Sequence, residues 1–141
     1  MIYISEIFEE FEKAKTKQDK IAVLQKYYSN NTFMAILSGT FDPRIEFFKL
    51  PRKFTYQPSD VPYGFAFTTL AHEHRNLGFF LEQYTALPVS GKIMKLKILV
   101  ESLHAGEAEV LIGMLKKKLK IKGLSKSLIK EVFPQFFPPK Q

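Results

Sequence analysis

Residues 108–134 read AEVLIGMLKKKLKIKGLSKSLIKEVFP, and this stretch predicts two helices joined by a short turn. Apolar residues recur at helical spacing in its first part, so we expect a helix over about 107–120 with one buried face. That face consists of Ala108, Leu111, Ile112, Leu115 and Leu119. Lys116, Lys117 and Lys120 would then lie on the opposite, solvent-exposed face.

The turn between the two helices is expected at Gly123, where a left-handed cap is needed that glycine adopts without strain. Ser125 can cap the second helix, and Pro134 ends it. Residues 116–130 hold seven lysines and no acid. Such a hairpin leaves backbone N–H groups free beside lysines and could hold a phosphate, although the same geometry also serves as an ordinary helix connection.

Helical patterns continue through the rest of the chain. Thr16 and Asp19 have the spacing of a capping box ahead of an apolar stripe. Asp42 is expected to cap another helix, because the proline that follows it suits the first helical position. The longest helix is expected over residues 67–84. Residues 50–63 contain three prolines and no helical period, which is typical of a loop.

These patterns predict an all-α fold of about six to eight helices, because strand-like alternation is sustained nowhere. With 141 residues, of which 45% are hydrophobic, the chain can form one compact domain. We place this domain at residues 1–133, followed by a Pro/Phe-rich tail at 134–141.

The net charge of +7 lies in the last third of the chain, where residues 92–141 hold eleven lysines and four glutamates. Such asymmetry favours a polyanionic partner, and a solubilising surface is an equally good explanation from charge alone. The chain has no cysteine, an acidic N-terminal stretch and no apolar run that could span a bilayer. We therefore expect a cytoplasmic protein without a membrane partner.

The histidines do not predict a catalytic or metal site. His72 and His74 flank Glu73, but residues two apart on a helix point about 200° away from each other and cannot share a metal. We expect His74 to be a core histidine with a hydrogen-bonded neighbour. His104 stands alone, and no glycine-rich phosphate loop is present. The sequence predicts a non-enzymatic protein without cofactor or metal, and a hydrolase using these histidines is a minor alternative.

Residues 108–134 are similar to the closing segment of the α-helical N-terminal DNA-binding domain of ATP-dependent DNA ligases. In that domain a helix runs into Leu-x-x-Gly, and a helix ending in an aromatic residue and proline follows. TKQDKIAVLQK at 16–26 resembles the opening helix of the T-even phage branch. NTFMAILSGTFDPRIEFFKLP at 31–51 resembles its segment with a paired-aromatic helix. The resemblance covers nearly the whole chain.

The chain also departs from the ligase pattern. Ligases carry AMP on the lysine of a Lys-x-Asp-Gly motif, whereas Asp19, Asp42 and Asp60 here do not precede glycine. The LKIKG spacing before Gly123 is one residue longer than Leu-x-x-Gly. The resemblance implies a freestanding, phage-encoded copy of the DNA-gripping domain, which would act in the host cytoplasm without forming the adenylate.

Our first interpretation is a largely sequence-independent binder of double-stranded DNA, including nicked or gapped duplexes. The residues expected to contact DNA are Lys116, Lys117, Lys120, Lys122, Gly123, Ser125, Lys126 and Lys130. By resemblance alone, Arg44, Lys49 and Lys53 would add a second contact.

The alternative is a protein-interaction module that binds a phage or host replication, transcription or defence protein. It would use the basic face or the aromatic residues of the VFPQFFPP tail, although Phe133, Phe136 and Phe137 are more typical of a core edge.

Overall fold

A computed structural model describes residues 3–62 and 64–137 of the chain. Within these residues the fold is all-α, with seven α-helices, two 3₁₀ helices and a single isolated β-bridge, which confirms the predicted fold class. The elements are α1 (Ile4–Lys13), α2 (Lys17–Lys26), α3 (Asn31–Phe41), α4 (Leu70–Glu73), η1 (His74–Phe80), α5 (Val89–Ser102), α6 (Ala105–Leu115), α7 (Lys126–Val132) and η2 (Pro134–Phe136).

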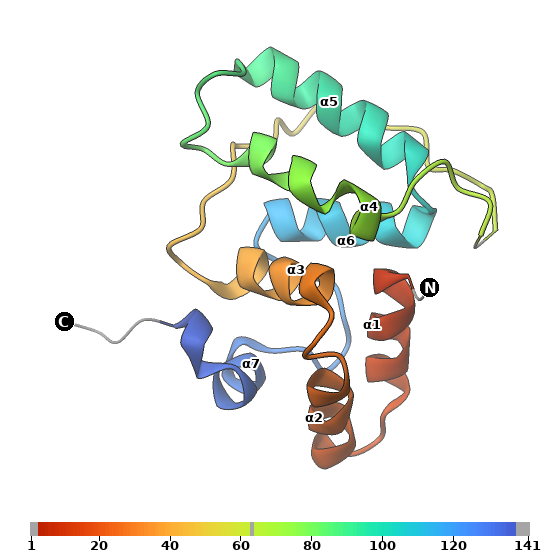
Figure 1. Cartoon of the computed structure of the whole chain (residues 1–141), viewed down its shortest axis with the longest axis vertical. Helices are drawn as coiled ribbons and strands as arrows, with labels where there is room; N and C mark the ends of the chain where they lie inside the picture. The colour runs from red at the N-terminus through yellow and green to blue at the C-terminus, as the bar shows by residue number, and fades with distance from the viewer. Residues whose placement is uncertain (1–2, 63, 138–141) are drawn as a thin grey trace.

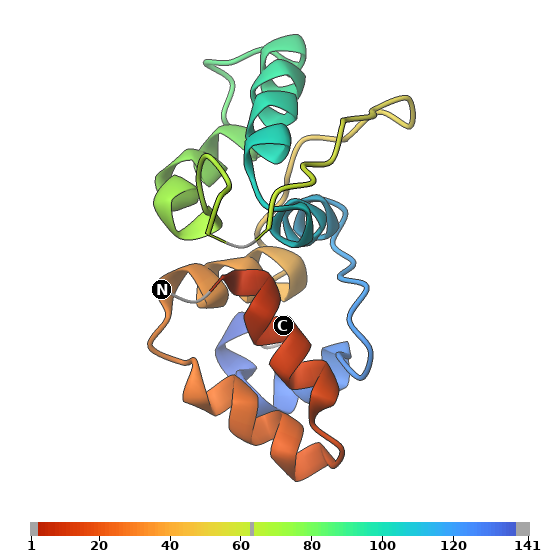
Figure 2. The same ribbon diagram turned by 90° about the vertical axis from the view of Figure 1, so that its right-hand side faces the viewer.

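The helices form an elongated molecule with two different ends. Figure 1 shows α2 and α7 at one end, α4 and α5 at the other, and α1, α3 and α6 between them. The central α6 contacts α1, α3 and α5, while α2 contacts α7. Viewed after a quarter turn in Figure 2, the segment before α4 projects from the side of the molecule. No helix in the described part of the chain is long and apolar enough to cross a membrane.

The contact between α3 and α6 depends on a glycine. A Cβ atom at Gly39 would lie 2.8 Å from the Met114 Sδ atom and 3.1 Å from the Phe47 ring. Both neighbours belong to the packed interior, where Met114 is 1% exposed. A side chain at Gly39 would therefore require the Met114 side chain and the Phe47 ring to shift, because both lie against this position of α3.

A buried carboxylate joins the starts of three helices. Glu107, in the first turn of α6, is 1% exposed. Its Oε2 accepts the Ile4 N–H of α1 at 2.8 Å, and its Oε1 accepts the Leu70 N–H of α4 at 2.9 Å. Burial raises the pKa of Glu107, and the two amide donors oppose that shift. The carboxylate thus satisfies backbone donors that have no partner inside their own helices.

Two predicted helices are wrong. The segment after Asp42 is extended rather than helical, and Phe47 forms a bridge with Leu81. The Asp42 carboxylate accepts the Arg44 N–H at 2.9 Å and binds the Arg44 side chain, so it closes a local turn instead of capping a helix.

The long helix expected over residues 67–84 is also much shorter. Thr69 accepts the His72 N–H and starts α4, and the backbone then tightens into η1 from His74 onward. Phe67 lies before this helix and is 96% exposed. The longest helix is α5, with 14 residues.

Candidate nucleic-acid interface

The lysine run begins where α6 ends. The helix stops at Leu115, five residues earlier than the expected end at about 120, because Lys117 adopts a left-handed backbone with φ of 60°. The N–H groups of Lys117 and Lys118 turn back to the carbonyls of Met114 and Gly113 at 3.0 and 2.9 Å. These bonds satisfy the last helical carbonyls, as a left-handed cap does.

Residues 118–122 continue as an extended segment with a two-residue alternation. Leu119 and Ile121 are half-buried against the core, whereas Lys118, Lys120 and Lys122 are exposed. Side chains of an extended chain point alternately to opposite sides, so the LKIK pattern itself separates the lysines from the core. The expectation that Lys120 lies on a helix face is therefore wrong. Lys118, which we did not predict as a site residue, lies with the exposed group.

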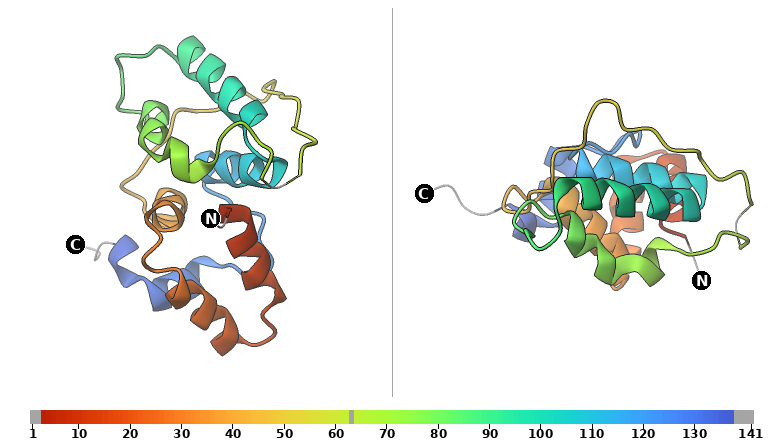
Figure 3. Two further views of the ribbon diagram at one scale, coloured as in Figure 1. Left: turned by 45° about the vertical axis from the view of Figure 1, so that its right-hand side comes forward. Right: turned by 90° about the horizontal axis from the view of Figure 1, so that it is seen from above.

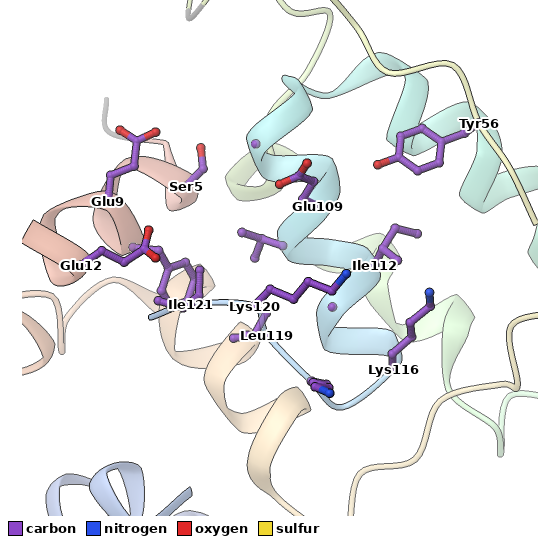
Figure 4. Close-up of a pocket in the computed structure, with 15 residues that line it drawn as sticks. Ser5, Glu9, Glu12, Tyr56, Glu109, Ile112, Lys116, Leu119, Lys120 and Ile121 are labelled. Atoms are coloured by element: carbon purple, nitrogen blue, oxygen red, sulfur yellow. The ribbon is translucent and has the colours of Figure 1, made fainter. Parts of the chain in front are cut away.

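Lys116, Lys118 and Lys120 border a cleft of about 370 Å³ between α1, α6 and this segment. Figure 4 shows Glu9 and Glu12 entering it from α1 and Glu109 from α6, with Lys120 extending along α6. Three lysines and three carboxylates thus line the same cleft. Mixed charge of this kind attracts a polyanion less strongly than an all-basic surface would.

Lys117 is part of the fold rather than a free phosphate contact. Its Nζ donates to the Asp42 carbonyl oxygen at 2.9 Å and lies 5.7 Å from the centre of the Phe47 ring. The side chain is half-buried, and this burial lowers the pKa of Lys117. Lys117 therefore connects the end of α6 to the end of α3.

Arg44 is likewise engaged within the protein. Its Nε and Nη2 atoms donate to the two Asp42 carboxylate oxygens at 3.0 and 2.8 Å. Nη2 also donates to the Gln135 carbonyl oxygen at 3.3 Å, which ties the turn to η2. These hydrogen bonds hold the pKa of the Asp42 carboxyl below its usual value.

The two other residues predicted by resemblance lie elsewhere. Lys49 and Lys53 are exposed on the segment between Phe47 and Gln57. Phe47 contacts Lys117, and the Gln57 N–H donates to Glu101 of α5 at 2.7 Å. Figure 1 shows this segment rising from α3 toward α5, away from α7. The structure does not group these lysines with the Gly123 turn.

The Gly123 turn has the positive φ that the sequence predicts, with a value of +85°. It is closed by the Leu124 N–H bonding to the Ile121 carbonyl oxygen at 3.1 Å. Because α6 has already ended, this glycine does not cap a helix. The Lys122 N–H is fixed by Glu12 at 2.9 Å, and a Cβ atom at Gly123 would lie 2.9 Å from the Lys20 side chain.

Ser125 caps α7 as predicted, since its Oγ atom accepts the Leu128 N–H at 3.2 Å. It also hydrogen-bonds with the Ser127 hydroxyl at 3.2 Å. Both serines line a hollow of about 390 Å³ between α7 and the first turns of α2. Lys17 and Lys20 line the same hollow, so the contact between α2 and α7 adds two lysines that are remote in sequence.

The result is a group of exposed or hollow-lining lysines around the Gly123 turn, which we call the basic surface. It comprises Lys17, Lys122, Lys126 and Lys130, together with Lys20, which is half-buried and whose ammonium group already donates to the Phe11 carbonyl oxygen at 3.0 Å. Lys126 and Lys130 share one stripe of α7, four residues apart. Glu131 is the one acid that lines the hollow, and it pairs with Lys17 at 3.2 Å. Both partners are more than half exposed, so the pair contributes little stability and opens easily.

The histidines have structural partners. The Nδ1 atom of half-buried His74 lies 3.1 Å from the Thr32 hydroxyl, which confirms the predicted hydrogen-bonded neighbour. His104 caps α6 by accepting the Gly106 N–H at 3.0 Å, and His72 is exposed. Among residues 3–62 and 64–137, no three His, Asp or Glu side chains are grouped to hold a metal.

The aromatic tail packs on the core as far as the structure describes it. Phe133 and Phe136 are 2% and 8% exposed, and Phe137 is half-buried against the core. The rest of the predicted tail, 138–141, lies outside the described residues. These three aromatic rings are therefore not free to dock a partner in this conformation.

Comparison with known proteins agrees with the fold. A solved structure named Pmar-Lig_PreS3, a ligase-related protein, matches 99% of this chain with a TM-score of 0.64 and 16% sequence identity. The chain spans 32% of the length of that structure. At this identity the likeness concerns the fold alone. No curated protein matches the sequence. The model of a family of unknown function, DUF6433, matches residues 7–121, and the chain therefore belongs to this family.

Proposed function

We propose that this protein is a non-enzymatic binder of double-stranded DNA that contacts phosphates through the basic surface, largely without reading sequence. The observation that carries the proposal is that Lys17 and Lys20 of α2 line one hollow with Ser125 and Ser127, while Lys122, Lys126 and Lys130 are exposed on the adjoining turn and on α7. Lysine ammonium groups and serine hydroxyls are common donors to phosphate oxygens, and such contacts position a protein on DNA without specifying bases.

The shape of the hollow supports this assignment. The Ser125 and Ser127 hydroxyls line the same hollow as Lys17 and Lys20. The Lys20 ammonium group donates to the Phe11 carbonyl oxygen at 3.0 Å, so Lys17 and the two hydroxyls are the donors of this hollow that we expect to reach a phosphate. The neighbouring cleft, with its three glutamates, is a poorer place for a phosphate. The likeness in fold to a ligase-related structure adds plausibility to DNA as the polyanion, and the proposal extends to duplexes with a nick or gap.

A mobility-shift titration tests the proposal. The protein is titrated against intact, nicked and gapped duplexes and single-stranded DNA of equal length, at several salt concentrations. We expect the duplexes to bind more tightly than the single strand, with little dependence on base sequence. If each lysine of the basic surface neutralises one phosphate, the log–log slope of affinity against salt should be about −4 to −5.

Two outcomes would contradict the proposal. A slope near zero would mean that phosphate neutralisation does not supply the affinity. A strong preference for one duplex sequence would mean that base edges, rather than the backbone, are recognised.

A further inference from the structure

An exposed tyrosine lies beside the basic surface. Tyr28 follows the end of α2 and is 59% exposed. Its ring stacks on the ring of Phe133, with the ring centres 6.0 Å apart and the planes inclined by 25°. Phe133 ends α7 and is buried, and Figure 3 shows α7 beside α2 at the lower end of its left-hand view. One face of the Tyr28 ring therefore rests on the protein, and its solvent-exposed surface includes the opposite face.

The location of Tyr28 sets it apart from the other exposed rings. Among the described residues, the other exposed phenylalanine and tyrosine side chains are Phe65 and Phe67, on the segment before α4. Figure 1 shows α4 at the end of the molecule opposite α2 and α7. Tyr28 is thus the one exposed ring in the described part of the chain that lies at the end carrying the basic surface.

The fold holds the Tyr28 ring in a fixed orientation. The Tyr28 N–H donates to the Gln25 carbonyl oxygen at 3.2 Å, and the Phe133 N–H donates to the Ile129 carbonyl oxygen at 2.7 Å. The Phe133 ring also contacts the Phe136 ring, with the centres 5.7 Å apart. A ring that is already oriented loses little conformational freedom when a ligand stacks on it, so less of the binding energy is spent on ordering it.

Tyr28 lies on the same helix contact that forms the hollow. Lys17 of α2 and Glu131 of α7 line the hollow and pair at 3.2 Å. Phe133 follows Glu131 by two residues, which is about 3 Å along a helix axis. Lys130 is exposed and lies within one turn of Phe133. A strand whose phosphates contact the basic surface would therefore have bases within reach of the Tyr28 ring.

We propose that Tyr28 stacks on an unpaired base of a DNA strand whose phosphates contact the basic surface. This role rests on the proposed function, because it requires those phosphate contacts. Bases inside an intact duplex stack on their neighbours, whereas a base in a gap has a face that a side chain can reach. Tyr28 would thus make the protein prefer a gapped duplex to an intact one without selecting the base, since every base has a π-face.

A single base fits Tyr28 better than a protein segment does. A peptide helix docks through several apolar anchors three or four residues apart, which need a groove with matching contacts. Tyr27 is half-buried, and Phe133 and Phe136 are buried, so Tyr28 presents one ring rather than a row of anchors. One exposed aromatic face is what stacking of one base requires.

Fluorescence anisotropy with three labelled duplexes of equal length tests this proposal. One duplex is intact, one has a one-nucleotide gap opposite an unpaired base, and one has the same gap opposite an abasic site. We expect the wild type to bind the gap with a base about tenfold more tightly than the abasic gap, as loss of one stacked base predicts. In Tyr28→Ala, the two gapped duplexes should bind equally, and the affinity for the intact duplex should stay at the wild-type value.

Three further variants separate stacking from other effects. Tyr28→Phe keeps the ring and should keep the tenfold difference. Tyr28→Leu retains an apolar contact with Phe133 but has no aromatic face, so it should lose the difference. Phe67→Ala removes an exposed ring from the segment before α4 and should behave as the wild type does. Thermal melting of each variant checks that the fold is retained.

The results distinguish this role from the proposed function. If the wild type binds the intact duplex with the expected salt slope but does not distinguish the two gapped duplexes, the role of Tyr28 is wrong and the basic surface stands. If Tyr28→Leu keeps the difference, apolar contact rather than stacking is responsible. If Tyr28→Ala weakens binding to all three duplexes equally, Tyr28 only supports α7. Absence of salt-dependent binding to any of the three duplexes would overturn both proposals.

Discussion

Single residues decide which of the predicted lysines can reach a ligand. Lys117 stands in the middle of the lysine run, yet its left-handed backbone turns its ammonium group inward onto the Asp42 carbonyl oxygen. Its neighbours Lys116 and Lys118 are exposed. Reversing the charge of Lys117 would disturb packing between α3 and α6, so a loss of DNA binding in such a variant would not identify a phosphate contact.

The ionisation of Asp42 makes the free energy of unfolding depend on pH in the acidic range. The Arg44 hydrogen bonds hold its pKa below the ordinary value, so the folded state favours the ionised form more than the unfolded state does. This stabilisation is fully present above the unfolded pKa of about 3.9 and is lost as pH falls through the folded pKa. Urea unfolding at a series of pH values should therefore show a steeper loss of stability below pH 4 in the wild type than in Asp42→Asn. Equal slopes in both proteins would contradict this assignment.

Gly123 makes the turn before α7 possible because its φ is +85°. Gly123→Val should destabilise the fold by about 1–3 kcal/mol, since a β-branched residue resists this conformation. Gly123→Asn should cost less, because asparagine tolerates the left-handed region. Both changes add a Cβ atom beside the flexible end of Lys20, so the difference between them reports backbone strain. Thermal unfolding compares the two, and equal losses would indicate that crowding rather than φ matters.

At the scale of the helix, α7 offers a direct test of the basic surface. Replacing Lys126 and Lys130 by glutamate leaves buried Leu128 and Ile129 untouched. We expect at least about a tenfold loss of duplex affinity and a salt slope that is less steep by about 2. Fluorescence anisotropy with a labelled duplex measures both quantities.

The matched control is the Lys95→Glu, Lys97→Glu variant of α5, which removes the same net charge at the far end of the molecule. It should bind DNA nearly as the wild type does. If the two double variants lose affinity equally, attraction by total charge rather than a defined surface is responsible.

Structural elements that depend on contacts between residues close in sequence could be predicted from the sequence. The caps at Thr16 and Ser125 were predictable, because a side chain there bonds to a backbone N–H three residues later. The extended segment after Asp42 was not predictable, because the Asp42 side chain binds Arg44 instead of capping a helix and Phe47 pairs with Leu81. The early end of α6 depends on a positive φ at a lysine, for which the residue type gives no signal.

The candidate site shows the same division between local and distant determinants. Lysines of the 116–130 run are evident in the sequence. Lys17 and Lys20 join them only because α2 packs on α7, a contact between segments about 110 residues apart. The period-2 alternation of LKIK could have shown that Lys118 is exposed, had an extended conformation been considered instead of a helix.

For the whole molecule, Glu107 of α6 connects the middle of the fold to the end that holds α4. Its carboxylate binds the first turns of α1 and α4, which belong to different parts of the elongated fold. Glu107→Gln keeps the volume, but an amide group has one oxygen and cannot accept both N–H groups in the same way. We expect a loss of about 1–3 kcal/mol in the free energy of unfolding, the cost of a buried donor without an acceptor.

Urea unfolding at neutral pH measures the Glu107→Gln effect. Glu109→Gln, the same change two residues later on α6 at an exposed position, is the control and should alter stability by less than about 0.5 kcal/mol. Equal stability of Glu107→Gln and the wild type would contradict a joining role for this carboxylate.

During translation, Ile4 and Leu70, whose N–H groups donate to Glu107, are synthesised well before Glu107 itself. Ile4 and Leu70 precede Glu107 by 103 and 37 residues. At translation rates of about 5–20 residues per second, roughly 5–20 seconds separate the appearance of Ile4 from that of Glu107. During this interval a nascent chain carries α1 without α6, one of the two helices that pack on it. The N-terminal half must therefore remain accessible to chaperones and proteases until α6 has left the ribosome.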